Sequence, residues 1–336
     1  MRCFVKAGKL ELNQIESLLN GGLGALRKDV VFGPAVGLDC GIVDVGHGMY
    51  GVLKSDPITF ATDRIGWYAV NVNANDIATA GAMPQWFLST ILLPESSRVE
   101  DVNKVCSDLH DAACEIGVSI VGGHTEVTSA VNQVVVSGTM IGLVKKEELI
   151  HPANIKQGHV LVVTKGAAIE ATAIAAFEKA EEVSRAFGDD FQKKAAAYLD
   201  YPGISIIREA QIFKKYNAYG MHDTTEGGVR AAVYEIAKAS GLSVTFNSDL
   251  VPVSKITASI CAHFGMDPLG AIGSGSLISA MDKNEAEKAL LELDEIGVAA
   301  VIAGTFGEAC KDSVEIKNGE VIPLVYNPCD EITKLF

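Results

Sequence analysis

The sequence lacks paired cysteines and clustered basic residues. Its seven cysteines are odd in number, widely spaced and without a C-x-x-C pair, so they indicate neither a zinc site nor a disulfide framework. The formal net charge of −14 argues against nucleic-acid binding, which requires clustered Lys and Arg to neutralise phosphates. The acidity is typical of a soluble protein, or of carboxylates gathered around divalent cations.

Long apolar runs are also missing. Residues 160–177 are apolar but include Lys165 and Glu170, and residues 134–144 are too few to span a bilayer. The first ten residues have no apolar core of the kind found in a signal peptide. We therefore expect a soluble, cytoplasmic protein that binds neither membrane nor nucleic acid.

The two common phosphate-binding glycine motifs are absent. No G-x-x-x-x-G-K-[ST] sequence occurs, and the glycines of GAIGSG (270–275) have the reverse spacing of the G-x-G-x-x-G dinucleotide motif. This segment is either a tight turn that enters a strand or a ligand-binding loop.

The length of 336 residues is sufficient for two domains. A polar turn at 145–148, Pro152 and a new apolar segment at 160–163 predict domains at 1–150 and 151–336. Short apolar segments, rich in β-branched residues in the first half, predict strands at 58–62, 85–93, 118–121, 133–143, 160–163, 242–246, 276–280 and 298–303. Helical periodicity predicts helices at 67–82, 102–116, 167–187, 203–216, 227–240 and 283–296. The pattern is typical of an α+β protein.

Short segments with an Asp beside small residues or after an apolar strand are the chemical feature of the chain. They contain Asp39, Asp63, Asp76 and Asp223, and the loop GGHTE (122–126) also ends a predicted strand. A single Asp at a strand end is commonly a helix cap or turn residue. Asn75 and Asp76 differ, because they lie within an Ala-rich helix where short polar side chains are unfavourable. Buried carboxylates require cations or donors, and Mg²⁺ commonly bridges carboxylates to phosphate oxygens.

The same segments resemble the AIR synthase-like (PurM-like) superfamily, which includes thiamine-monophosphate kinase, selenophosphate synthetase and, nearest to this sequence, the hydrogenase-maturation protein HypE. The order of the motifs is that of the family over most of the chain. The matching segments are GLDCG (37–41), ATD (61–63), NVNANDIATAGAMP (71–84), GGHTE (122–126), MHDTTEGG (221–228) and DPLGAIGSGSLI (267–278).

The resemblance implies a two-domain α+β fold, with an N-terminal barrel formed across a homodimer and a C-terminal mixed α/β sandwich. ATP and Mg²⁺ would bind between the domains, and the enzyme would activate a carbonyl or amide oxygen by phosphorylation, followed by dehydration or group transfer. The implied metal ligands are Asp39, Asp63, Asp76 and Asp223. The implied catalytic residues are His124 and Glu126, and the implied cofactor-binding residues are Lys9, Asn73, Asp76, Gly122, Gly123, Thr125, Gly227 and Gly228.

Two departures keep the activity open. HypE-type dehydratases end in a cysteine that carries the substrate, whereas here Cys329 stands seven residues before the last residue, and only Asp39 matches the first acidic pair of the family. The alternatives are a nucleotide-binding maturation partner without turnover, or a kinase of small molecules such as thiamine phosphate. Cys3 and Lys6 are spaced like the reactive Cys and Lys of selenophosphate synthetases, although Cys3 is more typical of a buried residue on the first strand. The substrate would be a small molecule or a cysteine-linked group on a protein partner.

Overall fold

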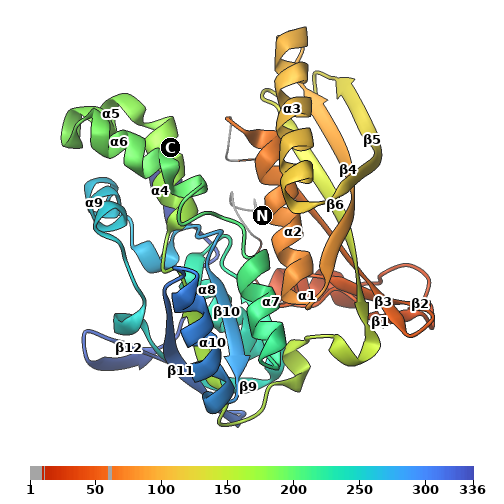
Figure 1. Cartoon of the computed structure of the whole chain (residues 1–336), viewed down its shortest axis with the longest axis vertical. Coiled ribbons are helices and arrows are strands. Elements are labelled where there is room, and N and C mark those ends of the chain that lie inside the picture. The colour runs from red at the N-terminus through yellow and green to blue at the C-terminus, as the bar shows by residue number, and fades with distance from the viewer. Residues whose placement is uncertain (1–9, 11, 60–62) are drawn as a thin grey trace, which may run out of the picture. The chain divides into compact units, whose positions relative to one another are not determined.

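The computed structural model describes residues 10, 12–59 and 63–336, and it divides into two compact units (Figure 1). The N-terminal unit consists of Arg27–Gly33 and Asp39–Leu149, and the C-terminal unit contains Pro34–Leu38 and Ile150–Phe336. The described residues up to Leu26 group with the C-terminal unit, whereas the sequence predicts them in the first domain.

The N-terminal unit contains a six-stranded sheet of order β1-β2-β3-β6-β4-β5. All neighbouring strands are antiparallel except β4 and β5, which are parallel. The strands are β1 (Val30–Phe32), β2 (Gly41–Gly46), β3 (Met49–Ile58), β4 (Met83–Leu93), β5 (Ser119–Val127) and β6 (Val135–Lys145). Because β5 is at the edge, its outer backbone groups have no neighbouring strand within the described residues.

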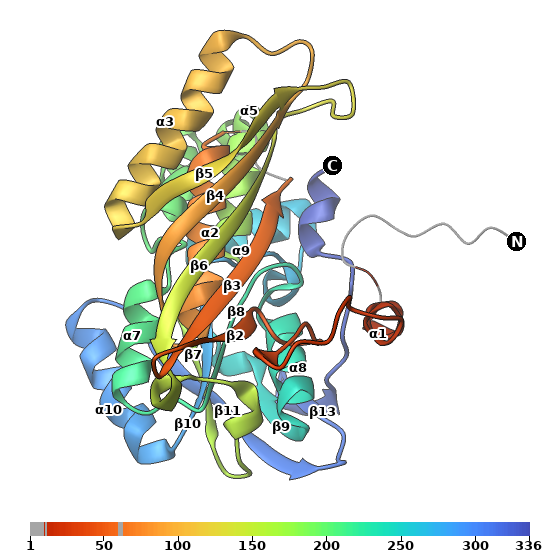
Figure 2. The ribbon, with the colours of Figure 1, turned by 90° about the vertical axis from the view of Figure 1, so that its right-hand side faces the viewer.

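Two helices cover this sheet, α2 (Ile65–Thr79) and α3 (Val99–Ile116) (Figure 2). Every residue of α2 is buried, because the helix contacts β3, β4 and β6 as well as α3. Glycines permit these close approaches: a Cβ at Gly66 would be 2.5 Å from the Val105 carbonyl oxygen, and one at Gly142 would be 2.4 Å from Ile77 Cγ2. The Ala-rich sequence of α2 predicts this packing on both sides.

The C-terminal unit has a seven-stranded sheet of order β13-β12-β9-β11-β7-β10-β8. Only β9 and β12 are parallel neighbours. The strands are β7 (Val160–Thr164), β8 (Gly220–Asp223), β9 (Leu242–Asn247), β10 (Leu277–Met281), β11 (Ala300–Ala309), β12 (Val314–Lys317) and β13 (Glu320–Pro323). Strands β7 and β10 are central and fully buried.

Helices pack on this sheet and extend beyond it. Helix α8 covers β8, β9 and β10, and its apolar side chains share a core with Leu161 and Val163 of β7. Helices α7 and α10 contact each other, β7, β10 and β11. The helices are α1 (Leu12–Asn20), α4 (Ile169–Glu178), α5 (Ala180–Phe187), α6 (Asp189–Ala196), α7 (Ile207–Lys215), α8 (Gly228–Ser240), α9 (Lys255–Phe264) and α10 (Lys283–Glu295).

The predicted helices and strands agree with the structure where a regular pattern of apolar residues continues over many residues. They are wrong where a turn interrupts that pattern. The helix predicted at 167–187 is two helices, α4 and α5, which meet at Lys179. The strand predicted from residue 58 is displaced, since β3 ends at Ile58 and residues 60–62 lie outside the described part. Among the described residues, no helix combines the length and the apolar character that a membrane crossing requires.

Candidate functional site

A cluster of charged side chains lies where β3 and α2 meet in the N-terminal unit. The ammonium of Lys54, on β3, lies 3.2 Å from an oxygen of Asp76 on α2 and 3.2 Å from an oxygen of Asp56 on β3. Asp76 is the most buried of the three, with a side chain that is 2% exposed. Asp39 is near enough for its charge to act on the same ammonium. We call Lys54, Asp39, Asp56 and Asp76 the carboxylate cluster.

The electrostatics of the cluster favour a cation strongly. Burial lowers the pKa of the Lys54 ammonium, but the charges of Asp76, Asp56 and Asp39 raise it more, so the pKa lies well above its usual value. Three carboxylates against one ammonium leave an excess of negative charge. Carboxylate oxygens are also the donors that Mg²⁺ prefers, and the ammonium stands at a position where a cation is stable.

Asn73 fixes the backbone of the cluster. Its side-chain oxygen accepts a hydrogen bond from the Asp56 N–H at 2.9 Å, and its amide nitrogen donates to the carbonyl oxygens of Asp56 at 3.2 Å and Ala69 at 2.9 Å. Asn73 is predicted to bind the cofactor, but the structure engages its amide with the protein backbone. It therefore positions Asp56 beside Asp76.

The carbonyl of Asp76 is likewise engaged. The Cys40 thiol donates to it at 3.1 Å and the Thr79 hydroxyl at 2.7 Å. Asp76 is thus held from strand, loop and helix at once, which explains how a short polar residue is accommodated in an Ala-rich buried helix.

Asp63 occupies a different environment. It forms an exposed ion pair with Lys104 of α3, with side chains that are 44% and 59% exposed. The cationic contact of Asp63 is therefore Lys104, whereas Asp56 contacts Lys54 at 3.2 Å. The sequence predicts Asp63 as a metal ligand and misses Asp56. The local signal for Asp56 is an acidic residue near the end of a strand, in KSDP (54–57), but the predicted strand begins only at residue 58 and leaves Asp56 outside it.

The predicted loop GGHTE lies entirely on β5, the exposed edge strand. His124 and Glu126 are two residues apart, so their side chains are on the same side of the strand, and His124 Nε2 is 2.9 Å from Glu126 Oε2. Gly123 requires glycine, because a Cβ there would be 2.0 Å from the Ser89 carbonyl oxygen. Gly122, Gly123 and Thr125 pair along β4 through Leu88, Ser89 and Ile91.

In the C-terminal unit, Asp223 ends strand β8 and is 1% exposed. One of its carboxylate oxygens, Oδ2, is buried without a hydrogen-bond partner among the described residues. His222 lies between two acids, with Nδ1 3.7 Å from Asp223 Oδ1 and Nε2 3.2 Å from Glu235 Oε2. Asp223 therefore keeps a buried oxygen available for a donor or a cation.

Gly227 and Gly228 begin α8, where the predicted phosphate-binding N–H groups would be. The Gly227 N–H donates instead to the carboxylate of Asp330 at 2.6 Å, and the Gly228 N–H donates to the Thr225 carbonyl at 3.0 Å. Both glycines are necessary for packing, since a Cβ at Gly228 would be 2.5 Å from the Ala271 carbonyl oxygen. The structure thus gives both N–H groups internal acceptors, and the cofactor-binding role of the two glycines stays a prediction.

Asp330 is a residue that the sequence does not single out. Its carboxylate also accepts hydrogen bonds from the N–H groups of Ile272 at 3.1 Å and Ile332 at 2.7 Å. Burial raises the pKa of Asp330, the backbone N–H bonds lower it, and the charge of Glu226 raises it, with a result of about 6. Asp330 fastens the last turn, Glu331–Leu335, to the 267–276 loop and to α8.

Glu170, near the start of α4, is a second buried acid that the sequence does not reveal. Burial raises its pKa to about 8, proximity to Ser274 lowers it, and the charges of Glu226 and Asp330 raise it. Oxygen Oε2 of Glu170 and the hydroxyl of Ser274 are both buried without hydrogen-bond partners among the described residues. The only sequence signal is an acidic residue within an apolar run.

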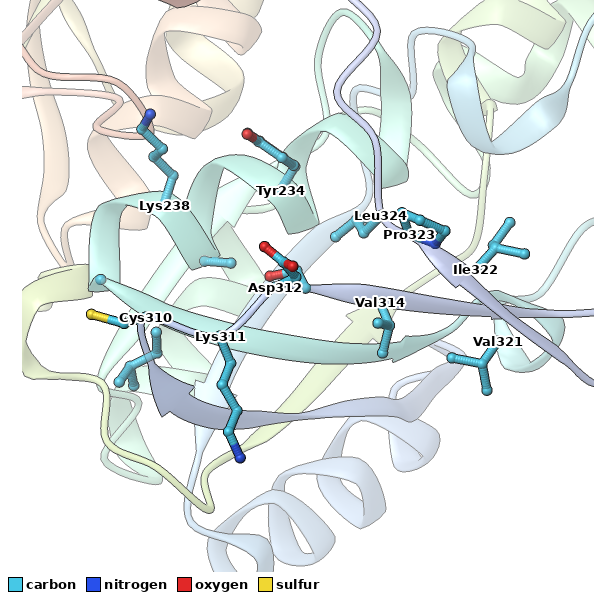
Figure 3. A pocket seen from close by; sticks show the side chains of 14 residues that line it. Tyr234, Lys238, Cys310, Lys311, Asp312, Val314, Val321, Ile322, Pro323 and Leu324 are labelled. Carbon is cyan, nitrogen blue, oxygen red and sulfur yellow. The ribbon is translucent and has the colours of Figure 1, made fainter.

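Lys9, Cys3 and Lys6 lie outside the described residues. A groove of about 600 Å³ lies between the C-terminal half of α8 and the β12–β13 hairpin (Figure 3). Its lining includes Tyr234, Lys238, Cys310, Asp312, Val321 and Leu324, which are neither the carboxylate cluster nor the glycine pair.

Comparison with known families covers both units. Residues 37–144 match the N-terminal domain of AIR synthase related proteins, and residues 156–317 match the C-terminal domain of AIR synthase related proteins. A proposed hydrogenase expression/formation protein of Methanocaldococcus jannaschii is 30% identical over 250 residues, which cover 74% of this chain and 72% of that protein. The carbamoyl dehydratase HypE of Escherichia coli is 27% identical over 253 residues, with coverage of 74% and 72%.

Solved structures share the fold. The hydrogenase maturation protein HypE in complex with ATP has a TM-score of 0.71 at 21% identity, and covers 95% of this chain and 91% of its own. ThiL in complex with AMPPCP and TMP also has a TM-score of 0.71, at 18% identity and 92% coverage of both chains.

Proposed function

Because this chain belongs to the AIR synthase-related family and has its two-domain mixed α/β fold, we propose that it is a HypE-like protein that binds ATP together with Mg²⁺. We propose further that it activates a carbonyl or amide oxygen by phosphorylation, followed by dehydration or group transfer. The observation that supports this most directly is the carboxylate cluster, since oxygen donors from two elements converge on one cationic position. A relative of this fold binds ATP and another binds an ATP analogue.

The roles of the residues follow from the geometry of each unit. Asp39, Asp56 and Asp76 would hold Mg²⁺, and bound Mg²⁺ would neutralise charge on phosphate oxygens. We propose Asp56 for the ligand role that the sequence predicts for Asp63. Asn73 on α2 binds the backbone of Asp56 on β3, and so it holds the carboxylates of Asp56 and Asp76 near each other. Little reorganisation of these two side chains would then be required when Mg²⁺ binds. Asp223, with its buried oxygen, remains a proposed ligand.

His124 and Glu126 are the proposed proton-transfer pair. They are hydrogen-bonded and exposed on β5, so a substrate can reach them without any opening of the core. The glycines beside them let β5 lie close to β4 and leave the strand without bulky neighbours.

The same strand supports a proposed homodimer with a barrel formed across it. Ile120, Val121 and Val127 of β5 are 42%, 55% and 59% exposed, and Trp86 and Met83 of β4 are also exposed. An edge strand with such side chains is usually covered by a partner. Light scattering should give a dimer mass for the wild type and a lower mass for Val121→Asp.

Calorimetric titration with ATP and Mg²⁺ tests the proposed function. The wild type should bind, and Asp76→Asn should weaken binding by about 100-fold or more, because a ligand charge is lost at constant shape. Asp44→Asn is the matched control, since Asp44 forms an exposed pair with Lys146 in the same unit. If the wild type does not bind, or if Asp76→Asn binds as Asp44→Asn does, the proposal is wrong.

A maturation partner without turnover is the second candidate. Cys329 lies in the segment that Asp330 fastens, with its sulfur 3.5 Å from the Thr333 hydroxyl, so it is held rather than extended. Phosphate release on addition of a carbamoylated cysteine peptide would favour the dehydratase. ATP binding without release would favour the partner, and transfer of labelled γ-phosphate to thiamine phosphate would favour a kinase.

A further inference from the structure

Lys54 is a cationic side chain that contacts two members of the carboxylate cluster at once. Its ammonium bridges two carboxylates at equal distances of 3.2 Å, from Asp56 on the strand and Asp76 on the helix. Its side chain is 20% exposed, so the contact is largely shielded from solvent. An ammonium between two carboxylates satisfies the same charge requirement as a metal ion.

The position of the ammonium conflicts with full coordination by a divalent cation. A Mg²⁺ ion requires oxygen ligands at about 2.0–2.1 Å in an octahedral arrangement. The two oxygens that face the ammonium, Asp56 Oδ2 and Asp76 Oδ1, can enter one coordination shell of this size together only if the ammonium moves from between them. Lys54 extends from β3 on a flexible four-carbon stem, which permits such a movement without a change of backbone.

We propose that Lys54 is an internal cation of the carboxylate cluster, which neutralises Asp56 and Asp76 in the metal-free protein and must be displaced when a divalent cation binds. The inference rests on the proposed function only for the assignment of Mg²⁺ to this cluster. It has two consequences. The metal-free unit is stable without any divalent cation, and the affinity of the cluster for metal is set by competition with its own lysine.

The arithmetic of charge gives the direction of the effect. Removal of the Lys54 ammonium makes the charge of the cluster more negative by one. Affinity for divalent cations rises with ligand charge. Lys54→Met should therefore bind Mn²⁺ about tenfold more tightly than the wild type, and its folded state should depend on the metal.

The experiment uses the full chain and Mn²⁺ alone, without nucleotide. Mn²⁺ affinity is measured by electron paramagnetic resonance, and thermal midpoints are measured in EDTA and in excess Mg²⁺. The wild-type midpoint should be the same in both solutions, whereas the Lys54→Met midpoint should fall in EDTA and recover in Mg²⁺. Lys104→Met is the matched control, because Lys104 pairs with Asp63 on the exposed surface of the same unit and its loss should change neither quantity.

Two results would overturn the inference. One is an Mn²⁺ affinity of Lys54→Met equal to or weaker than that of the wild type. The other is a midpoint of the variant that is insensitive to divalent cations. If Lys54→Met does not fold, the wild type decides by itself: nitrogen NMR of its lysine ammonium groups should show the Lys54 signal, assigned by Lys54→Arg, shift on saturation with Mg²⁺. An unchanged signal in metal-saturated protein rejects the displacement.

These measurements separate the inference from the proposed function. A protein that binds Mg-ATP while Lys54→Met leaves Mn²⁺ affinity unchanged keeps the function and loses the inference. A protein that binds no ATP but whose Lys54→Met variant requires metal for stability loses the function and keeps the inference.

Discussion

The two units of the molecule both bury carboxyl groups, and they compensate the charge in different ways. In the N-terminal unit, Asp56 and Asp76 share the ammonium of Lys54. In the C-terminal unit, Asp330 accepts three backbone N–H bonds and Glu170 keeps its proton near neutral pH, while neither contacts a cationic side chain among the described residues.

The difference indicates what each region can exchange. A carboxylate compensated by an ammonium can exchange that ammonium for another cation, so the N-terminal unit is suited to metal binding. A carboxyl group compensated by a proton responds to pH, so the C-terminal unit is suited to proton-dependent stability. Four substitutions test this contrast.

Asp76→Ala should have the largest effect. Removal of Asp76 leaves the Lys54 ammonium largely buried with one weaker contact, and breaking a buried pair in this way typically costs about 3–5 kcal/mol. The double variant Asp76→Ala with Lys54→Met should recover much of this loss, because the uncompensated charge is also removed. Urea unfolding of the single and double variants measures the coupling, and simple additivity of the two changes would contradict the ion-pair interpretation.

Glu170→Gln should change the pH dependence of stability. The pKa of Glu170 is raised from 4.5 to about 8 in the folded protein, so its protonated form stabilises the fold fully below about pH 4.5 and this contribution is lost as pH rises through 8. At pH 9 the variant should be more stable than the wild type by roughly 3 kcal/mol, since it cannot ionise. Unfolding free energies are measured from pH 4.5 to 9.

The control for this profile is Glu181→Gln, because Glu181 is exposed on α5. Its profile should be parallel to that of the wild type. A Glu170→Gln profile that is also parallel would show that Glu170 is not protonated at neutral pH.

Asp330→Ala should have an intermediate effect. It leaves the N–H groups of Gly227, Ile272 and Ile332 without their acceptor, and we expect a loss of about 2 kcal/mol together with release of the last turn. Thiol labelling of Cys329 should become faster, because this cysteine belongs to the same segment. Asp312→Ala, on an exposed turn, is the control, and equal labelling rates in both variants would exclude the fastening role.

Asp63→Ala should have the smallest effect. An exposed ion pair contributes less than ~1 kcal/mol, so neither the unfolding free energy nor the Mn²⁺ affinity should change appreciably. Asp56→Ala should weaken Mn²⁺ binding at least tenfold in the same titration. If Asp63→Ala weakens Mn²⁺ binding more than Asp56→Ala does, the metal ligand is Asp63 and not Asp56.

The sequence predicts parts of this arrangement for identifiable reasons. Asp76 stands out because a polar residue in a small-residue helix conflicts with the pattern around it, and the structure buries that residue against a cation. The fold follows from motif order over most of the chain and agrees with the matched family domains. These are properties of local sequence, so they are visible without a structure.

The remaining contacts join distant segments and have no local signal. Gly227 and Asp330 are 103 residues apart, and nothing near either residue predicts that one provides the acceptor for the other. Asp56 and Asp63 are both acidic residues near the end of one predicted strand, and only pairing of β3 with β6 decides which of them faces α2. Nothing in the local sequence distinguishes Lys54 from other strand residues, because its contact with Asp76 depends on the packing of α2 against β3.

Asn73 has a mechanical consequence. Its amide binds both the N–H and the carbonyl of Asp56 on the strand while remaining within its own helix, so α2 and β3 are joined at the level of the carboxylates. Any hinge motion of the surrounding loops would therefore carry Asp56 and Asp76 together. The spacing between the two carboxylates would stay constant during such a motion, and the flexible side chain of Lys54 would be the part that moves.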